Sequence, residues 1–166
     1  MAVTTTAMSA VDATVEVSVN GTTWTNISGS SNSVEPGEQT RMTGVAYVFE
    51  GDVGIVTSGK REPLEITVSA LYTETAGETF ETIRALFEAG TRLYFRYSPQ
   101  GLGATGRAVY TASNDGATAG ACIISNLSWP TAEAETADPV AVSFQVMAPA
   151  LIRTTTGNST GLGSGA

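Results

Sequence analysis

The sequence predicts a mainly β protein, a β-sandwich or flattened barrel of about seven to eight strands with one amphipathic helix. Three observations lead to this fold class. Several segments alternate apolar and polar residues with the period of two that is typical of half-buried strands. Turn-forming pairs such as Asn20-Gly21 and Asp138-Pro139 separate these segments. One stretch, residues 75–90, has the apolar spacing of an amphipathic helix.

Residues 14–27 have the pattern of a β-hairpin. Three valines between residues 15 and 19 alternate with polar residues, and Asn20-Gly21 follows as a two-residue turn. That turn would pair Val17 with Trp24 and place the indole on the valine face. We therefore expect Trp24 in the core rather than on a ligand-binding surface.

Residues 28–42 are expected to form a long loop, because they show no apolar period and few apolar side chains. Structureless loops of this length are uncommon unless they are functional or disordered. The segment is therefore the first candidate for contact with a partner. The residues expected to make that contact are Ser30, Asn32, Val34, Glu35, Pro36, Gly37 and Glu38.

The remaining segments predict strands on both sides of the helix. Residues 44–50, with Val45, Tyr47 and Phe49 on one face, and residues 63–72 are expected to be half-buried strands. Thr75 and Glu78 fit a capping box at the start of the helix, and Gly90 is expected to end it. Further strands are expected at residues 91–97, 106–112, 119–128 and 140–148.

The predicted domain organisation is a single β domain over residues 1–150. Residues 151–166 are rich in Gly and Thr, which predicts a flexible tail. No window approaches the length of apolar sequence that spans a membrane, so no membrane partner is expected.

The composition argues against several functional classes. Sixteen acidic residues against eight basic ones give a net charge of -8, the wrong sign for holding nucleic acid. With no histidine and one cysteine, the chain lacks the ligands of common zinc sites and the base of a serine or cysteine nucleophile. Cys122, between small and apolar residues, is expected to be buried. We expect neither an enzyme nor a protein with a cofactor or bound metal.

Five segments resemble the major tail tube proteins of long-tailed bacteriophages. They are T-S-G-K-R-E-P-L-E-I-T-V at 57–68, L-F-E-A-G at 86–90, L-Y-F-R-Y-S-P-Q-G at 93–101, G-A-C-I-I-S at 120–125, and D-P-V-A-V-S-F-Q-V-M-A-P at 138–149. The resemblance covers roughly residues 43–149 and consists of order and composition rather than a catalytic signature. It implies a structural protein that forms hexameric rings, stacked into the tube through which the genome leaves the virion.

The resemblance also implies partners and a location. The protein would contact copies of itself and the tape measure, tail terminator and baseplate proteins. Double-stranded DNA would pass through without specific binding, because an acidic wall repels phosphate. The protein would be made in the host cytoplasm and reside in the virion tail.

Within this interpretation, three sets of residues receive roles. Glu50 and Asp52 are expected on the lumen wall, if the strand that carries Phe49 continues past Gly51. Arg92 and Arg96, opposite Leu93 on their strand, are expected either at the solvated surface or in contact with acidic groups such as Glu65 on another strand or subunit. The contact residues between Ser30 and Glu38, within the predicted loop of residues 28–42, are expected to reach the neighbouring ring.

Two other functional classes stay open from the sequence. A carbohydrate-binding or adhesin-like β-sandwich would use Trp24 or Trp129 as a platform for a sugar ring. An enzyme would be restricted to carboxylate chemistry by the absence of histidine. A buried pair of close carboxylates in a cleft would favour the enzyme.

Overall fold

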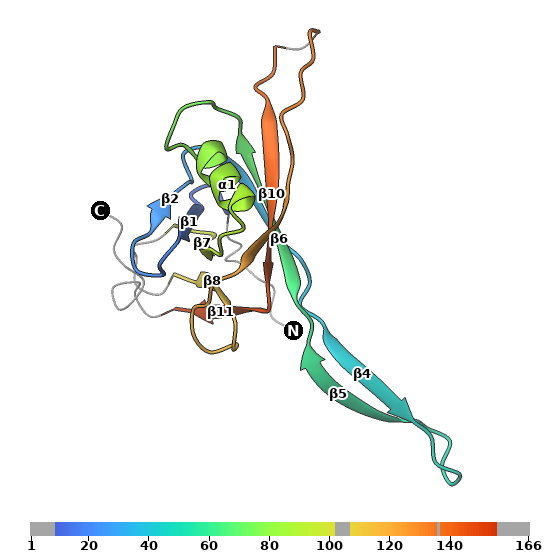
Figure 1. Ribbon diagram of the computed structural model, residues 1–166. Coiled ribbons are helices and arrows are strands. Elements are labelled where there is room, and N and C mark those ends of the chain that lie inside the picture. The colour runs from blue at the N-terminus through green and yellow to red at the C-terminus, as the bar shows by residue number, and fades with distance from the viewer. Residues whose placement is uncertain (1–8, 102–106, 136, 156–166) are drawn as a thin grey trace.

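A computed structural model of the protein describes residues 9–101, 107–135 and 137–155. This part of the chain contains eleven strands and one helix, and all the strand pairs are antiparallel. Two sheets pack face to face around one core, and a separate two-stranded hairpin projects from them (Figure 1). The mainly β, sandwich-like fold predicted from the sequence is confirmed.

The sheets are built from segments far apart in the sequence. The five-stranded sheet has the order β11 (Ala150–Thr154), β8 (Val109–Ser113), β7 (Tyr94–Ser98), β1 (Thr14–Ser18) and β2 (Thr25–Asn26). The four-stranded sheet has the order β3 (Ser31–Pro36), β6 (Leu64–Leu71), β10 (Ala141–Ala148) and β9 (Ile123–Leu127). The projecting hairpin consists of β4 (Arg41–Ala46) and β5 (Ile55–Arg61).

Strands β6 and β10 supply the centre of the core. Along both strands every second residue is buried, as the period of two predicted. Cross-strand pairing sets Val68 opposite Phe144 and Ile66 opposite Val146 on the inner face. These side chains pack against Val17 and Phe95 of the five-stranded sheet in one apolar cluster. The prediction of a half-buried strand at residues 63–72 is confirmed.

Helix α1 (Thr79–Glu88) packs beside β6 and β9 and buries Phe80 and Ile83. Gly90, with φ of +64°, ends the helix as predicted, because that backbone conformation favours glycine. The predicted capping box is wrong. The N-cap residue is Glu78, which makes no side-chain capping bond, because its carboxylate accepts a hydrogen bond from the Thr73 hydroxyl instead.

The N-terminal hairpin forms with a longer turn than predicted. Val17 pairs with Thr25 rather than with Trp24. The Asn20 carboxamide oxygen accepts hydrogen bonds from the backbone N–H groups of Thr22 and Thr23, at 2.9 and 2.8 Å, and this stabilises the wider turn. Trp24 is still only 9% exposed, so its predicted burial is confirmed.

The long loop predicted at residues 28–42 is wrong. Strand β3 occupies Ser31–Pro36 in the middle of this segment and pairs with β6, with a bulge between Ser31 and Ser33. An edge strand is held by backbone hydrogen bonds on one side and needs few apolar side chains, so its sequence lacks a clear period. Val34 alone of its side chains packs against the core.

Two other segments depart from the predictions. The strand expected at residues 44–50 ends at Ala46, and every residue of β4 is exposed rather than half-buried. The tail predicted at residues 151–166 begins too early, because Ala150–Thr154 form β11 and pair with β8. Residues 156–166 lie outside the described part of the chain.

Strand β3 and the tip of the hairpin should respond differently to deletion. Removing residues 30–39 uncovers the edge of β6. We therefore expect the cooperative thermal transition to disappear, or its midpoint to fall by more than about 10 °C. Replacing residues 47–54 with Asn-Gly removes no buried side chain and should leave the melting temperature nearly unchanged. Circular dichroism measures both. A 30–39 deletion that melts like the full chain would mean that β3 does not support the sandwich.

Candidate assembly surfaces

The described residues offer little that could do chemistry. They contain no group of three or more His, Cys, Asp or Glu side chains that could hold a metal ion. Cys122 is buried, and burial raises the pKa of its thiol to about 12, so the thiol stays protonated and unreactive at neutral pH. None of the described helices is long and apolar enough to cross a membrane. The candidate functional features are therefore surfaces.

The first surface is the β4–β5 hairpin, which extends away from both sheets (Figure 1). Eight large apolar side chains on it are more than half exposed: Met42, Val45, Tyr47, Val48, Phe49, Val53, Ile55 and Val56. Contiguous exposed apolar surface on a small protein marks an interaction site. The sequence carried a signal of this, because apolar residues occupy both faces of residues 45–49, whereas a strand covered on one face alternates.

The turn of this hairpin brings apolar side chains together at its tip. A Cβ on Gly54 would lie 2.8 Å from Val45 Cγ1 and 3.0 Å from Tyr47 Cε1, so the glycine makes room for the Tyr47 ring. Glu50 and Asp52, expected on a continuing strand, lie in the turn and are exposed. The strand alternation that placed them on one wall is therefore absent.

Residues expected to form the inter-ring loop lie along β3 and its exit. Glu35 and Pro36 pair with Thr67 and Ile66 of β6. The Gly37 N–H donates to the Glu65 carbonyl oxygen at 2.7 Å, and a Cβ on Gly37 would come within 2.8 Å of that oxygen. This close approach requires glycine. The side chain of Glu65 itself is exposed.

Arg96 is not at the protein surface. It is 1% exposed, and its Nε donates to the Glu16 carboxylate at 2.5 Å. The Trp24 ring lies against the guanidinium, 4.1 Å from ring centroid to Cζ. Burial lowers the pKa of Arg96 and the Glu16 hydrogen bond opposes this, so the group remains charged at neutral pH.

The expected role of Arg96 in a subunit contact is therefore wrong. Its acidic partner lies on another strand of its own chain and is Glu16 rather than Glu65. Arg92, which precedes β7, is exposed, and its contact with another subunit stays a prediction. The sequence did contain a hint. Glu16 stands between two buried valines on β1, where an acid needs a buried partner.

A second surface is the outer face of the four-stranded sheet. The side chains along the middle of this face are hydroxyls and amides with two carboxylates: Ser33, Glu35, Glu65, Thr67, Ser69, Ser143 and Gln145. Leu71, Ile123 and Met147 add apolar groups towards its ends. Gln145 Nε2 donates to Thr67 Oγ1 at 3.4 Å across the sheet. Strands β3, β6, β9 and β10 carry no lysine or arginine. In the described chain β3 and β9 are the edges of this sheet, each with one side unpaired.

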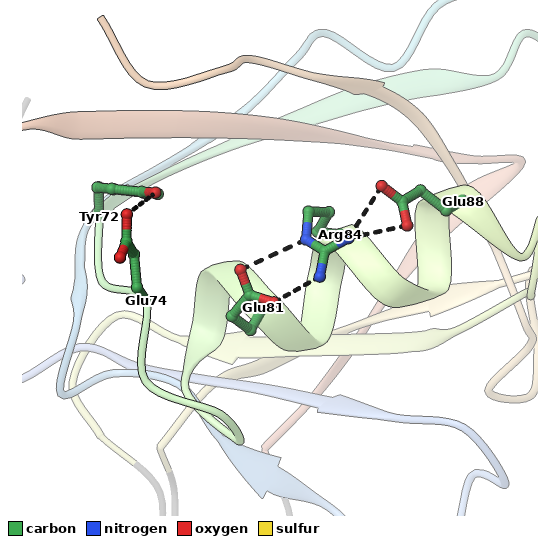
Figure 2. Close-up of polar contacts among 5 residues, drawn as sticks. All are labelled: Tyr72, Glu74, Glu81, Arg84 and Glu88. Atoms are coloured by element: carbon green, nitrogen blue, oxygen red, sulfur yellow. Dashed lines mark hydrogen bonds and ion pairs between the residues drawn. The ribbon is translucent and has the colours of Figure 1, made fainter. Parts of the chain in front are cut away.

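A third surface is the exposed side of α1 (Figure 2). Arg84 binds Glu81 at 2.6 Å and Glu88 at 2.9 Å, and its hydrogen bond lowers the pKa of Glu81. The Tyr72 hydroxyl donates to Glu74 at 2.9 Å, which raises the pKa of Tyr72. The one cation of the helix is thus shared between two acids. The surface keeps a net negative charge.

Solved structures share this fold over most of the chain. A chain of the PVC sheath-tube complex of an extracellular contractile injection system has a TM-score of 0.65 and 17% identity, covering 87% of this chain and 89% of that one. A chain of the PVC sheath/tube terminator structure has a TM-score of 0.68 and 16% identity, covering 90% and 97%. This protein has a tail-tube-like fold. A chain from the tail of an empty GTA particle, refined with C6 symmetry, matches with a TM-score of 0.61 and 13% identity, covering 91% and 100%.

These likenesses are of fold rather than of sequence. No protein-family model matches the sequence, and no curated protein does. The match to the chain of the PVC sheath-tube complex covers 89% of that chain, so the shared architecture is not limited to one sheet.

Arg96 should stabilise the subunit rather than its assembly. Because Arg96→Met leaves the buried Glu16 carboxylate without its ion-pair partner, we expect it to lower the free energy of unfolding by about 3–5 kcal/mol. The double variant Glu16→Met, Arg96→Met should lose less than the sum of the single losses. Urea denaturation measures all three, with Arg84→Met on the exposed helix face as the control expected to change little. Equal, small effects at Arg96 and Arg84 would contradict a buried pair.

Proposed function

We propose that this protein is the structural subunit of a tail-like tube, in which copies close into hexameric rings that stack into a conduit. The observation that carries the proposal is the β4–β5 hairpin, whose apolar side chains have no cover within the described chain. Such a surface is unfavourable in water and is stabilised when another molecule covers it. The likeness in fold to a chain of a C6-symmetric tail supports this function.

In this proposal the hairpin, rather than residues 28–42, is the arm that reaches a neighbouring subunit. Its apolar tip would be buried against the adjacent copy, and Glu50 and Asp52 would lie at the rim of that contact, where carboxylates keep access to water. The unpaired edges of β3 and β9 suit a second contact. Pairing them between copies within a ring would join the four-stranded sheets and remove exposed edges.

The wall that faces the cargo is, in this proposal, the outer face of the four-stranded sheet. Hydroxyl and amide groups give a wet surface, and Glu35 and Glu65 add negative charge without any cation on the same strands. A wall of this kind repels the phosphates of double-stranded DNA and offers them no arginine contact. Glu50 and Asp52 would then lie away from the wall.

A tube function also implies a location and partners for the subunit. The subunit would reside in the virion tail, and the ends of the tube would contact terminator and baseplate proteins, with a tape measure protein inside during assembly. The role is mechanical and requires no catalytic step. Long-tailed phage and contractile particles both fit the fold.

The carbohydrate-binding alternative loses one of its two platforms. Trp24 is buried against Arg96 and has no free ring face for a sugar. Trp129 is 58% exposed, but it packs edge-on against Phe80 with ring centroids 6.5 Å apart. A single tryptophan without convergent polar groups is a weak basis for sugar binding, so this function is not proposed.

Hairpin variants test the assembly role directly. Tyr47→Ser with Phe49→Ser removes two exposed aromatic rings at the tip, and we expect folded subunits that no longer form tubes. Negative-stain microscopy and sedimentation measure assembly, and circular dichroism checks the fold. The matched control, Val11→Ser with Val19→Ser, alters two exposed valines away from the hairpin and should assemble normally. Normal tubes from the hairpin variant would remove the hairpin from the contact.

Arginines on the proposed wall should convert a repelling surface into a binding one. With Thr67→Arg and Gln145→Arg, tubes should protect a short DNA duplex from nuclease at low salt. The protection should decline as salt rises, with a slope of about 0.9 for each phosphate that the new arginines neutralise. The control, Thr22→Arg with Thr23→Arg, adds the same charge to an exposed turn. Equal protection by both variants would show that the wall lies elsewhere.

A further inference from the structure

We propose that copies stack head to tail through a basic groove at the base of the β4–β5 hairpin, which receives the acidic loop of residues 129–135 from the next copy. This inference rests on the proposed tube function and adds the residues, the partner and the direction of the contact. Three observations lead to it: a groove, an unbalanced cluster of cations, and an acidic loop at the far end of the molecule.

The groove opens where the hairpin leaves the sandwich. Its volume is about 450 Å³, and Arg41, Arg61 and Arg153 are among the residues that line it. Tyr97 and Tyr110, stacked with ring centroids 5.2 Å apart, also line it and supply an aromatic surface. An aromatic surface combined with exposed guanidinium groups suits a ligand that is part apolar and part anionic.

The cations of this groove are not balanced inside the chain. Arg41 and Arg61 are directly opposite each other in the hairpin register, an arrangement of like charges that destabilises a strand pair. With Arg153, which also lines the groove, and Lys60, which precedes Arg61 in β5, they account for four of the eight basic residues. Among the described residues the ion pairs involve Arg84 and Arg96 alone.

The acid next to Arg61 in the sequence does not form an ion pair with this cluster. Glu62 follows Arg61, and its carboxylate accepts a hydrogen bond from the Thr40 hydroxyl at 2.5 Å. Two carboxylates, Glu38 and Glu62, beside four cations leave the hairpin base positive in a chain whose net charge is -8. A positive patch on an acidic protein is complementary to the rest of the same protein's surface.

The complementary loop follows β9. Glu133 and Glu135 are exposed, and no lysine or arginine occurs from Ile123 to Ile152. Trp129, 58% exposed, opens the loop four residues before Glu133 and, although one edge packs against Phe80, supplies an apolar group. Figure 1 shows this loop and the β4–β5 hairpin at opposite ends of the molecule. The indole matches the tyrosine surface of the groove, and the carboxylates match its guanidinium groups.

The groove and the acidic loop lie at opposite ends of the subunit, and this placement determines the kind of assembly. When two complementary patches lie at opposite ends of one subunit, the contact does not close on itself and the assembly grows in one direction. A second copy is favoured over nucleic acid because the loop already carries the right charge and because the negative chain repels a duplex. Exposed charge pairs are screened within about 8–10 Å at physiological salt, so stacking should weaken as salt rises.

Charge reversal on each side tests the contact. The groove variant carries Arg41→Glu and Arg61→Glu, and the loop variant carries Glu133→Arg and Glu135→Arg. Each variant alone sets like charges against each other, so we expect rings without tubes and at least a ~10-fold rise in the concentration needed for stacking. An equimolar mixture of the two ring preparations, or all four changes in one chain, restores opposite charges and should restore tubes. Negative-stain microscopy and sedimentation at two salt concentrations measure this, with circular dichroism to confirm folding.

The outcomes separate this inference from the proposed function. If the unaltered protein forms neither rings nor tubes, the proposed function itself fails. If the unaltered protein forms tubes and both variants do as well, the function stands and the groove-loop contact is wrong. Loss of tubes in both variants without rescue in the mixture or the fourfold variant also overturns the contact. Binding of a short DNA duplex that is lost in the groove variant, with stacking unchanged, would assign the groove to nucleic acid.

Discussion

The pairing of β6 with β10 is the interaction on which the rest of the structure depends. It runs without interruption from the Leu64–Ala148 pair to the Leu71–Ala141 pair. Because side chains alternate along a strand, a shift of one residue would move Ile66, Val68 and Phe144 from the core to the outer face. The register therefore fixes both surfaces of the sheet at once: the apolar face that holds the five-stranded sheet, and the hydroxyl-rich face opposite.

The hairpin is also held by this pairing, because β5 leads directly into β6 through Glu62 and Pro63. The Glu62 N–H still donates to the Thr40 carbonyl oxygen at 2.9 Å, but Pro63 has no N–H to continue the ladder of backbone hydrogen bonds. From that point the chain towards the hairpin leaves the sandwich, and its apolar side chains cannot reach the core. The apolar side chains of the sandwich are buried within the subunit, whereas those of the hairpin stay exposed to water. This difference is a physical reason for the proposed assembly.

The same division explains what the sequence could predict. Strands with one buried face, such as β6 and β10, and the core-facing side of α1 leave a periodic pattern that can be recognised. Strand β3 is held by backbone bonds, and β11 by pairing with β8, so neither needs a strong side-chain pattern. The prediction of a half-buried strand at residues 44–50 was wrong because Val45, Tyr47 and Phe49 have the pattern of a buried face, although nothing within the described chain covers them. Arg96 was misplaced because alternation gives its face but not the burial of that face by Trp24.

The positions of the few cations finally show how one composition can serve two purposes. Arg96 is neutralised in the interior and Arg84 on the helix, which leaves the hairpin base as the largest group of cations unpaired with any described acid. Spread evenly, eight basic residues among sixteen acids would only dilute the negative charge. Four of them gather at the hairpin base and none lies on the strands of the four-stranded sheet, so the subunit has an electrostatic direction. In the proposed tube, the cation-free strands suit a conduit for an anionic cargo, and the electrostatic direction suits a polymer that grows in one direction.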